Sequence, residues 1–342
     1  MDTMLNTIDL AEAGYLPDWL VRIGIRRLLT QRLKNSQSTD VAAFAQQLRS
    51  APLAVETQSA NDQHYEVAAE FFETCLGPRL KYSSCLFPDS STSLAEAEEH
   101  MLQLTCERAA ITDGMSVLEL GCGWGSLTLW IAEHFPDCAI TAVSNSNSQR
   151  KFIERRAHQQ GFSNIRVITS DMREFATDDR FDRIVSIEMF EHMRNYALLF
   201  SRVANWLTPE GKAFVHVFCH RDTPYLFNSE GSDNWMGRHF FTGGVMPSLE
   251  LFSHFDECLS IDKRWVVDGL HYWRTCESWL RNLDCNRAVA LEALSSHSSP
   301  KQAKLAIQRW RLFFMACAEL FRYRHGREWF VGHYLFARRQ TC

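Results

Sequence analysis

Short apolar runs alternate with helical periods of apolar residues between positions 115 and 218. Each short run is typical of a buried strand, and each segment that follows repeats its apolar positions with the period of a helix. The strands are predicted at 115–120, 139–143, 165–169, 183–187 and 213–218, and the helices at 127–135, 149–160 and 195–207. Strands that alternate with helices form a parallel, doubly wound sheet. The pattern therefore predicts an α/β fold.

The regions on either side of this alternation have a different pattern. Before it, helices are predicted at 9–34, 41–48, 65–76 and 93–108, with a linker at 49–62. After it come an insertion rich in Phe, His and Trp at 219–258, a strand at 259–268, a mainly helical stretch at 275–323 and a final strand at 329–337. We therefore expect an N-terminal helical cap (1–110), a core (111–218), a lid or substrate-binding insertion that includes the strand at 259–268 (219–325), and a final core strand (326–342). The sheet should have seven strands, most of them parallel.

Composition narrows the class of protein. Apolar residues make up 46% of the chain, which is enough for a sizeable core. The net charge of −5 argues against a nucleic-acid-binding protein, because phosphate neutralisation dominates affinity there. The longest apolar runs are too short for a transmembrane helix. The acidic N-terminus lacks the pattern of a signal peptide, so we expect a cytoplasmic protein.

The cysteines fit the same setting. The chain has 11 of them, an odd number, and no C-x-x-C pair. This usage argues against a disulfide framework and against a zinc site, and it favours a reducing cytosol. We therefore predict no bound metal.

The first long helix carries alternating Leu, Ile, Arg and Lys residues between positions 20 and 34. A basic amphipathic helix of this kind can lie on an anionic membrane. The simpler interpretation, a surface helix that buries one face, is preferred. We expect no stable membrane insertion.

A glycine turn follows the first strand of the core. Gly121, Gly123 and Gly125 alternate with Cys122 and Trp124, and Glu119 precedes the first glycine by two positions. Glycine allows a sharp turn and a close approach of the backbone to a ligand. The helix that follows offers unpaired N–H groups at its N-terminus. The stretch resembles motif I of class I S-adenosylmethionine (AdoMet) methyltransferases, in which the acid and the glycine backbone hold the amino-acid end of AdoMet.

Polar residues also follow the next strands of the predicted sheet. These clusters are Ser144-Asn145-Ser146, Ser170-Asp171-Met172 and Glu188-Met189-Phe190-Glu191-His192. Ligands of doubly wound sheets bind outside the carboxyl ends of the strands. Three polar clusters at the same edge of the sheet therefore predict a binding site there.

Motifs along most of the chain resemble the cyclopropane fatty acid synthase superfamily of methyltransferases, and most of all its coclaurine N-methyltransferase-like branch. The resemblance rests on the segments 81–87, 121–125, 186–193 with 195–196, 214–220, 240–248 and 269–272. It implies a Rossmann-like class I methyltransferase fold with AdoMet as cofactor. By position within these motifs, the residues implied to contact AdoMet are Tyr82, Ser83, Gly121, Gly123, Asn145, Gln149, Asp171, Met172 and Ile187.

The branch decides the chemistry. In the lipid-modifying enzymes a cysteine, a glutamate, a histidine and a tyrosine hold bicarbonate; here Ser84 replaces the cysteine, while the other three correspond to Glu191, His216 and Tyr272. Those enzymes also have a small residue, usually glycine, at the position of Glu188. An additional carboxylate suits a cationic substrate. Methylation of a small amine is therefore preferred, transfer to an unsaturated acyl chain of a lipid is the alternative, and a non-catalytic AdoMet-binding protein is the third candidate.

An amine is mostly protonated at neutral pH, so the enzyme must remove a proton before the nitrogen can attack. We expect His192 to be the proton acceptor, because imidazole titrates near neutrality. Glu188 and Glu191 are expected to orient His192 and to bind the ammonium. The predicted partner is a small-molecule amine, with no nucleic acid, and a homodimer is a possible assembly. The identity of the amine does not follow from the sequence.

Overall fold

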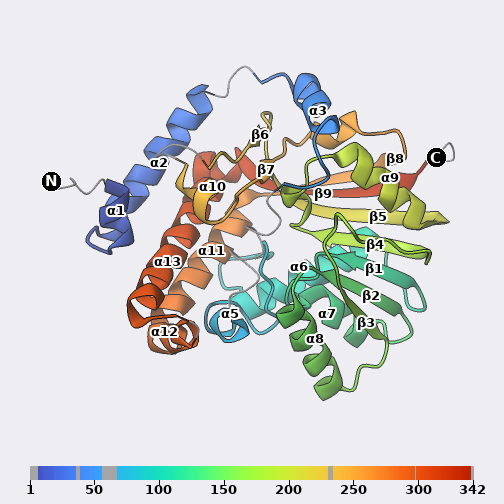
Figure 1. The fold of residues 1–342 in the computed structure, drawn as a ribbon, viewed down its shortest axis with the longest axis horizontal. Helices are drawn as coiled ribbons and strands as arrows, with labels where there is room; N and C mark the ends of the chain where they lie inside the picture. Colours follow the sequence, from blue (N-terminus) through green and yellow to red (C-terminus); the bar gives the residue numbers. More distant parts are fainter. Residues whose placement is uncertain (1–6, 36–38, 56–67, 230–233, 297, 340–342) are drawn as a thin grey trace.

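A computed structural model describes residues 7–35, 39–55, 68–229, 234–296 and 298–339 of the chain (Figure 1). Its centre is a seven-stranded sheet in the order β3-β2-β1-β4-β5-β9-β8. The strands are β1 (Ser116–Leu120), β2 (Ala139–Ser144), β3 (Ile165–Thr169), β4 (Phe181–Ile187), β5 (Leu207–His220), β8 (Leu259–Val267) and β9 (Trp329–Arg338). Strands β1 to β5 are parallel, and β9 runs antiparallel to both β5 and β8. The predicted α/β fold with a mostly parallel seven-stranded sheet is confirmed.

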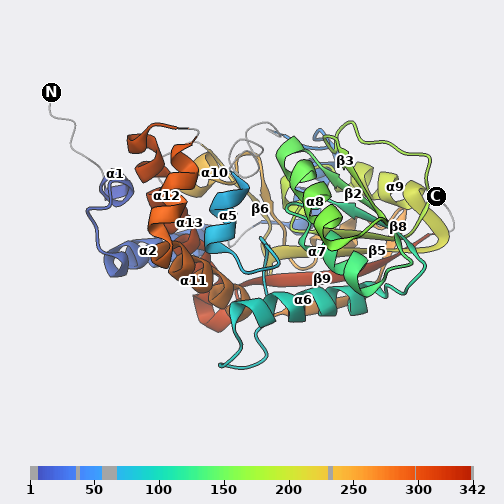
Figure 2. The same ribbon diagram turned by 90° about the horizontal axis from the view of Figure 1, so that it is seen from below.

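The crossover helices are α7 (Ser126–His134), α8 (Asn147–Gln160) and α9 (Tyr196–Trp206). Capping residues determine where these helices begin and end. Ser146 accepts a hydrogen bond from the Gln149 N–H at the start of α8, and Gly161 ends that helix with a φ of 77°. Helix α6 (Leu94–Ala109) begins with a capping box formed by Ser93 and Glu96. It packs against α7 and β5 and covers one face of the sheet (Figure 2).

The predicted helix at 9–34 is wrong as a single element. The structure has α1 (Thr7–Glu12) and α2 (Asp18–Asn35), because Gly14 takes a φ of 75° between them and Pro17 precedes the second helix. Arg22 and Arg26 of α2 form ion pairs with Glu319. Part of the basic face of α2 is therefore turned towards the protein, in agreement with the surface-helix interpretation.

The other N-terminal helices pack at separate places. Helix α3 (Val41–Arg49) contacts α9, whereas α5 (Ala69–Cys75) contacts α8 and two helices from the end of the chain. The predicted helix at 65–76 begins outside the described residues, and the described part ends at Cys75.

The chain between the late strands covers one edge of the sheet. Between β5 and β8 lie β6 (Tyr225–Leu226), α10 (Trp235–His239), β7 (Val245–Met246) and the 3-10 helix η3 (Leu251–His254). Between β8 and β9 lie α11 (Gly269–Cys285), α12 (Arg287–Ser295), α13 (Pro300–Arg322) and the 3-10 helix η4 (Tyr323–Gly326). Because the last residue of β5 pairs with the first residue of β9, these helices stand beside the carboxyl ends of the parallel strands (Figure 1).

Two sequence-based expectations bear on the whole chain. Within the described ranges, no helix is both long and apolar enough to cross a membrane. Among the residues that the structure describes, nine cysteines are free, and eight of these are buried. Cys258 is disulfide-bonded, so the expectation of a chain without disulfides is wrong at this residue.

Candidate active site

The glycine turn between β1 and α7 forms the floor of a groove. Gly121, Gly123 and Gly125 all have left-handed backbone conformations, with φ values of 79°, 52° and 79°. A Cβ at Gly121 would lie 2.7 Å from Met189, and one at Gly125 would lie 2.6 Å from Ile153. A Cβ at Gly123 would meet nothing within 4 Å. Gly123 therefore borders open space, while its two neighbours hold the turn against the protein.

Two adjoining hollows make up the groove. Gly121, Gly123, Gln149, Glu188 and His192 line both of them. The first hollow also contains Tyr82, Ser83 and Ile187, and the second contains Asn145, Asp171 and Met172. The structure thus brings together all nine residues that the sequence assigned to AdoMet. The groove runs past the open space at Gly123 and past the polar residues at the ends of two strands. This shape fits an elongated cofactor of this kind.

The polar side chains along the groove are held by one another. Ser144 donates a hydrogen bond to Oε1 of Gln149 at 2.6 Å. The carboxylate of Asp171 pairs with Arg173, and the closest N–O distance of that pair is 2.8 Å. Asn145 is half-buried beside them. These contacts hold the polar side chains that line the second hollow. The resemblance assigns this hollow to the adenosine part of AdoMet.

Glu119 and Lys81 lie at the other end of the groove, and both are buried. Oε2 of Glu119 accepts a hydrogen bond from the Thr128 hydroxyl. Burial raises the pKa of Glu119 to about 7. Lys81 donates to the Ser83 hydroxyl at 2.5 Å and to the Ser84 carbonyl at 2.8 Å. Burial lowers the pKa of this lysine.

Glu188 stands where the two hollows meet, and its side chain is 8% exposed. Oε1 accepts from the Ser84 N–H at 2.9 Å and lies 3.1 Å from Nε2 of His216. Oε2 accepts from the Tyr272 hydroxyl at 2.5 Å. Burial raises the pKa of Glu188 to about 6, against the opposing effect of the Lys81 charge. The Lys81 charge, the Ser84 N–H and the Tyr272 hydroxyl favour the ionised carboxylate against this burial.

The backbone of Glu188 is also unusual. Its φ is 48°, in the left-handed region where glycine is favoured and a side chain costs about 1–2 kcal/mol. Residues held in this way cluster at functional sites. A glutamate therefore stands here at a cost to the fold, at a position where the resemblance implies a small residue in the lipid-modifying enzymes.

Glu191 lies behind the surface of the groove. It belongs to the 3-10 helix η2 (Phe190–His192), its side chain is fully buried, and Oε1 accepts from the Phe218 N–H on β5 at 2.7 Å. Burial, together with the charge of Glu188, raises its pKa well above the ordinary value. The hydrogen bond from the Phe218 N–H anchors η2 to the sheet, and burial favours the neutral form of the Glu191 carboxyl. His192, the next residue, lines both hollows.

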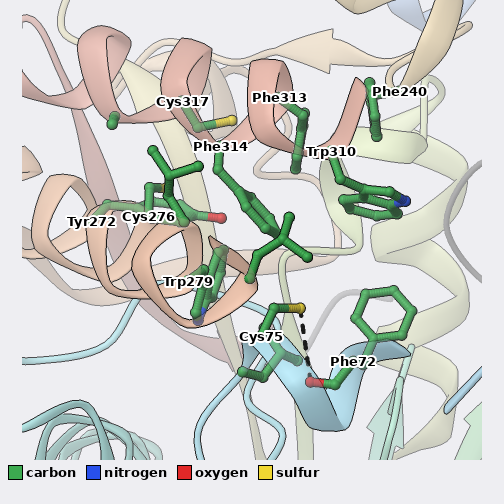
Figure 3. Packing of buried hydrophobic residues seen from close by; sticks show 14 of the residues in the cluster. Phe72, Cys75, Phe240, Tyr272, Cys276, Trp279, Trp310, Phe313, Phe314 and Cys317 are labelled. Carbon is green, nitrogen blue, oxygen red and sulfur yellow. Dashed lines mark hydrogen bonds between the residues drawn. The ribbon is translucent and has the colours of Figure 1, made fainter. Parts of the chain in front are cut away.

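Aromatic rings close the first hollow. Phe218, Phe241, Tyr272, Trp279 and Phe313 line it, and the ring of His192 stacks on Phe241 at 5.6 Å. Figure 3 shows Tyr272 and Trp279 of α11 on one side and Phe313, Phe314 and Cys317 of α13 on the other. The aromatic stripe of α13 therefore serves two purposes. Phe313 and Cys317 line the hollow, whereas Trp310, Phe314 and Phe321 pack in the core.

Sequence reasoning missed several residues of this site. Lys81 carries no signal beyond its place in a loop motif. Trp279 and Phe241 lie on segments far from the glycine turn, and only the fold brings them to it. His333, which contacts His216, did give a signal, because it is a polar residue inside a strand of otherwise apolar character. Among the described residues, no group of three His, Cys, Asp or Glu side chains is arranged to hold a metal ion.

Comparisons with known proteins agree with this geometry. Residues 54–328 match the model of the family described as mycolic acid cyclopropane synthetase. The chain is 37% identical over 339 residues to an (S)-coclaurine N-methyltransferase from Thalictrum flavum subsp. glaucum, covering 96% of this chain and 94% of the relative. A crystal structure of coclaurine N-methyltransferase bound to N-methylheliamine and S-adenosylhomocysteine superimposes with a TM-score of 0.93 at 35% identity, covering 96% of this chain and 98% of the other.

A cyclopropane synthase from Mycobacterium tuberculosis shares the fold, with a TM-score of 0.71 at 23% identity over 84% of this chain and all of the other. The chain therefore belongs to the mycolic acid cyclopropane synthetase family and is an AdoMet-dependent methyltransferase of the branch that contains the coclaurine N-methyltransferases.

Proposed function

We propose that the protein transfers the methyl group of AdoMet to the nitrogen of a small amine that carries an aromatic group. The observation that carries this proposal is the carboxyl group of Glu188, which receives hydrogen bonds from the Ser84 N–H and the Tyr272 hydroxyl and stands between the groove and a wall of aromatic rings. An ammonium beside a carboxylate and aromatic faces is stabilised by charge and by cation–π attraction. The relatives that act on coclaurine and pavine nitrogen support the same substrate class.

AdoMet, when bound, supplies an electrophilic methyl group for direct in-line displacement. Tyr82 and Ser83 would close over it, Gly121 and Gly123 would hold its amino-acid end, and Asn145 and Gln149 would contact its ribose region. Asp171 and Met172 would face the adenine, and Ile187 would lie near the sulfur. The open space at Gly123 supports this assignment.

The protein's own task is to present a neutral nitrogen at attack distance. We assign the attraction of the ammonium to Glu188 and the acceptance of its proton to His192, which lines both hollows. Glu191 positions His192 by anchoring η2 to the Phe218 N–H of β5. Burial and the neighbouring charge of Glu188 both disfavour a second negative charge at Glu191.

The alternative, transfer to an acyl chain, is weakened by the contacts of Glu188. The lipid enzymes hold bicarbonate through residues that correspond here to His216 and Tyr272 among others. In this protein both side chains contact the Glu188 carboxylate instead. A free bicarbonate would have to displace a tethered carboxylate to bind the same groups.

Incubation of the protein with labelled AdoMet tests the proposal. The panel should hold aromatic-bearing primary, secondary and cyclic amines alongside vesicles of an unsaturated phospholipid. We expect label on an amine, and we expect Glu188→Gln to raise KM more than it lowers kcat. Glu154→Gln, a change at an exposed ion pair with Arg150, is the matched control. Both reactions add one CH₂ unit, so fragmentation must locate it. A bicarbonate-stimulated methylene on the acyl chain would overturn the proposal.

A further inference from the structure

A row of side chains crosses the sheet from Glu188 to the far edge. His216 on β5 pairs in register with His333 on β9, and His333 pairs in turn with Trp265 on β8. Register partners point to the same face of a sheet. Both histidines are fully buried. The row therefore leads from the active site towards the surface that α6 covers.

Continuous hydrogen bonds run along this row. Oε1 of Glu188 lies 3.1 Å from Nε2 of His216, and Nδ1 of His216 lies 2.9 Å from Nε2 of His333. Nδ1 of His333 lies 2.8 Å from a guanidinium nitrogen of Arg108 on α6. The guanidinium carbon of Arg108 sits 5.0 Å from the ring centre of Trp265, which holds the arginine at the end of the row.

Arg108, at the end of the row, determines which ring nitrogen carries the proton in both His333 and His216. An arginine side chain only donates hydrogen bonds and does not lose its proton in a protein. Nδ1 of His333 must therefore accept, which places the His333 proton on Nε2. That proton points at Nδ1 of His216, so the proton of His216 lies on Nε2 and is donated to Glu188. One arginine thus sets both tautomers and the direction of the last hydrogen bond.

The charged surroundings agree with two neutral rings. Burial lowers the pKa values of His216 and His333 well below the ordinary value, and the charges of Arg108 and Lys81 act in the same direction on both. The groups that face Glu188 are Lys81, the Ser84 N–H, Tyr272, His216 and Glu191. Glu107 is the charged neighbour of Arg108. A neutral His216 can offer Glu188 either a proton or a lone pair, and only the first supports a carboxylate.

We propose that Arg108 and His333 are positioning residues, which keep Glu188 as a hydrogen-bonded carboxylate by fixing the tautomer of His216. This inference rests on the proposed function of Glu188. The relay is not a route for the substrate proton to leave, because Arg108 cannot accept one. Its effect is to favour ionised Glu188, and therefore ammonium binding, at the acidic end of the working pH range.

Kinetics over a range of pH test the relay. Arg108→Met removes the donor and keeps a side chain over Trp265, and His333→Phe breaks the row. We expect both to move the acidic limb of kcat/KM upward by about 0.5–1 pH unit, as the loss of one hydrogen bond to an ionised group implies. Arg108→Lys restores an obligate donor and His333→Gln restores an N–H towards His216, so both should lie near the wild type. Arg79→Met, which removes another arginine stacked over a tryptophan at 5.0 Å, should change nothing.

Nuclear magnetic resonance of ¹⁵N-histidine-labelled protein separates this inference from the proposed function. Long-range proton–nitrogen spectra report the tautomer of each ring without any substrate. Protons on Nε2 of both His216 and His333, with mixed tautomers in Arg108→Met, would support the relay even if no amine were methylated. A proton on Nδ1 of either ring in the wild type would overturn it. So would a folded Arg108→Met enzyme with an unchanged acidic limb.

Discussion

Replacing Glu188 by glycine should turn the active site into an exchangeable anion site. The change deletes a carboxylate that receives the Ser84 N–H, the Tyr272 hydroxyl and, through the relay, the Nε2 proton of His216. It leaves the backbone unstrained, because the φ of 48° at this position suits glycine. The three donors then surround a space that a small oxyanion such as bicarbonate or formate can fill.

The structure sets the size of the effect on stability. Each buried donor left without an acceptor costs about 1–3 kcal/mol, so three cost at least about 3 kcal/mol. Relief of the left-handed strain returns about 1–2 kcal/mol. The net loss is therefore about 1 kcal/mol or more, and an anion at ten times its Kd returns about 1.4 kcal/mol of it. Bicarbonate should thus recover that part of the lost stability and raise the Tm of the variant.

Thermal unfolding and methyl-transfer assays, with and without bicarbonate or formate, test whether Glu188→Gly has such an anion site. We expect either anion to raise the Tm of Glu188→Gly and to recover part of the lost kcat/KM, because it restores a negative charge beside the ammonium. Glu188→Gln is the control, because its amide fills the same space and should show no response. If the glycine variant ignored both anions, or responded no more than the glutamine variant, the three groups would not form an anion site and the reasoning would be refuted.

Three further predictions concern the groove. Gly123→Val should abolish AdoMet binding in calorimetry, because its side chain would enter open space, whereas Gly161→Val, at a φ of 77° and with equally open space at the end of α8, should bind normally. His192→Ala should slow methyl transfer by ~10²–10⁴-fold at neutral pH. The loss should be smaller in rates measured at higher pH, because more of the amine is then already deprotonated. A near-normal rate at pH 7 would mean that a carboxylate, and not His192, accepts the proton. In the folded protein the pKa of Glu119 is raised to about 7, above its ordinary value of 4.5. The protonated side chain therefore stabilises the fold fully below pH 4.5, and this stabilisation is lost as the pH rises through 7. Glu119→Gln should remove up to about 3 kcal/mol of that decline in urea titrations at pH 5 and pH 8, and an unchanged pH dependence would contradict it.

The strands of the core could be predicted because burial on both faces makes them short, continuous apolar runs. Strand β3 begins and ends where the sequence placed it, at Ile165 and Thr169. Strand β5 begins at Leu207, six residues before the predicted start. Pro209 and Gly211 are residues that favour turns, and the local sequence does not reveal that neighbouring strands would hold this segment extended.

The cofactor half of the groove could be predicted for the same reason that the strands could. Parallel strands end at a common edge, so the polar residues after β2, β3 and β4 had to converge. The substrate half could not be placed in this way. Tyr272 and Phe313 come from helices that precede the last strand, and no local pattern states which face of α11 or α13 meets the glycine turn. The same limit applied to Arg108, whose relevance depends on the register of three strands.

The backbone at position 188 connects the two chemistries of this family. A left-handed residue at the end of β4 is most easily glycine, and the donors around it, from Ser84, His216 and Tyr272, form an anion site whatever the side chain. With glycine, the site can take a free oxyanion, which a reaction needs when a carbocation must lose a proton. With glutamate, the anion is tethered and always present, which suits a substrate that arrives as a cation. Because the relay from Arg108 favours an acceptor at this point in either case, a single substitution at position 188 can exchange a diffusible base for a fixed charge without rebuilding the surrounding site.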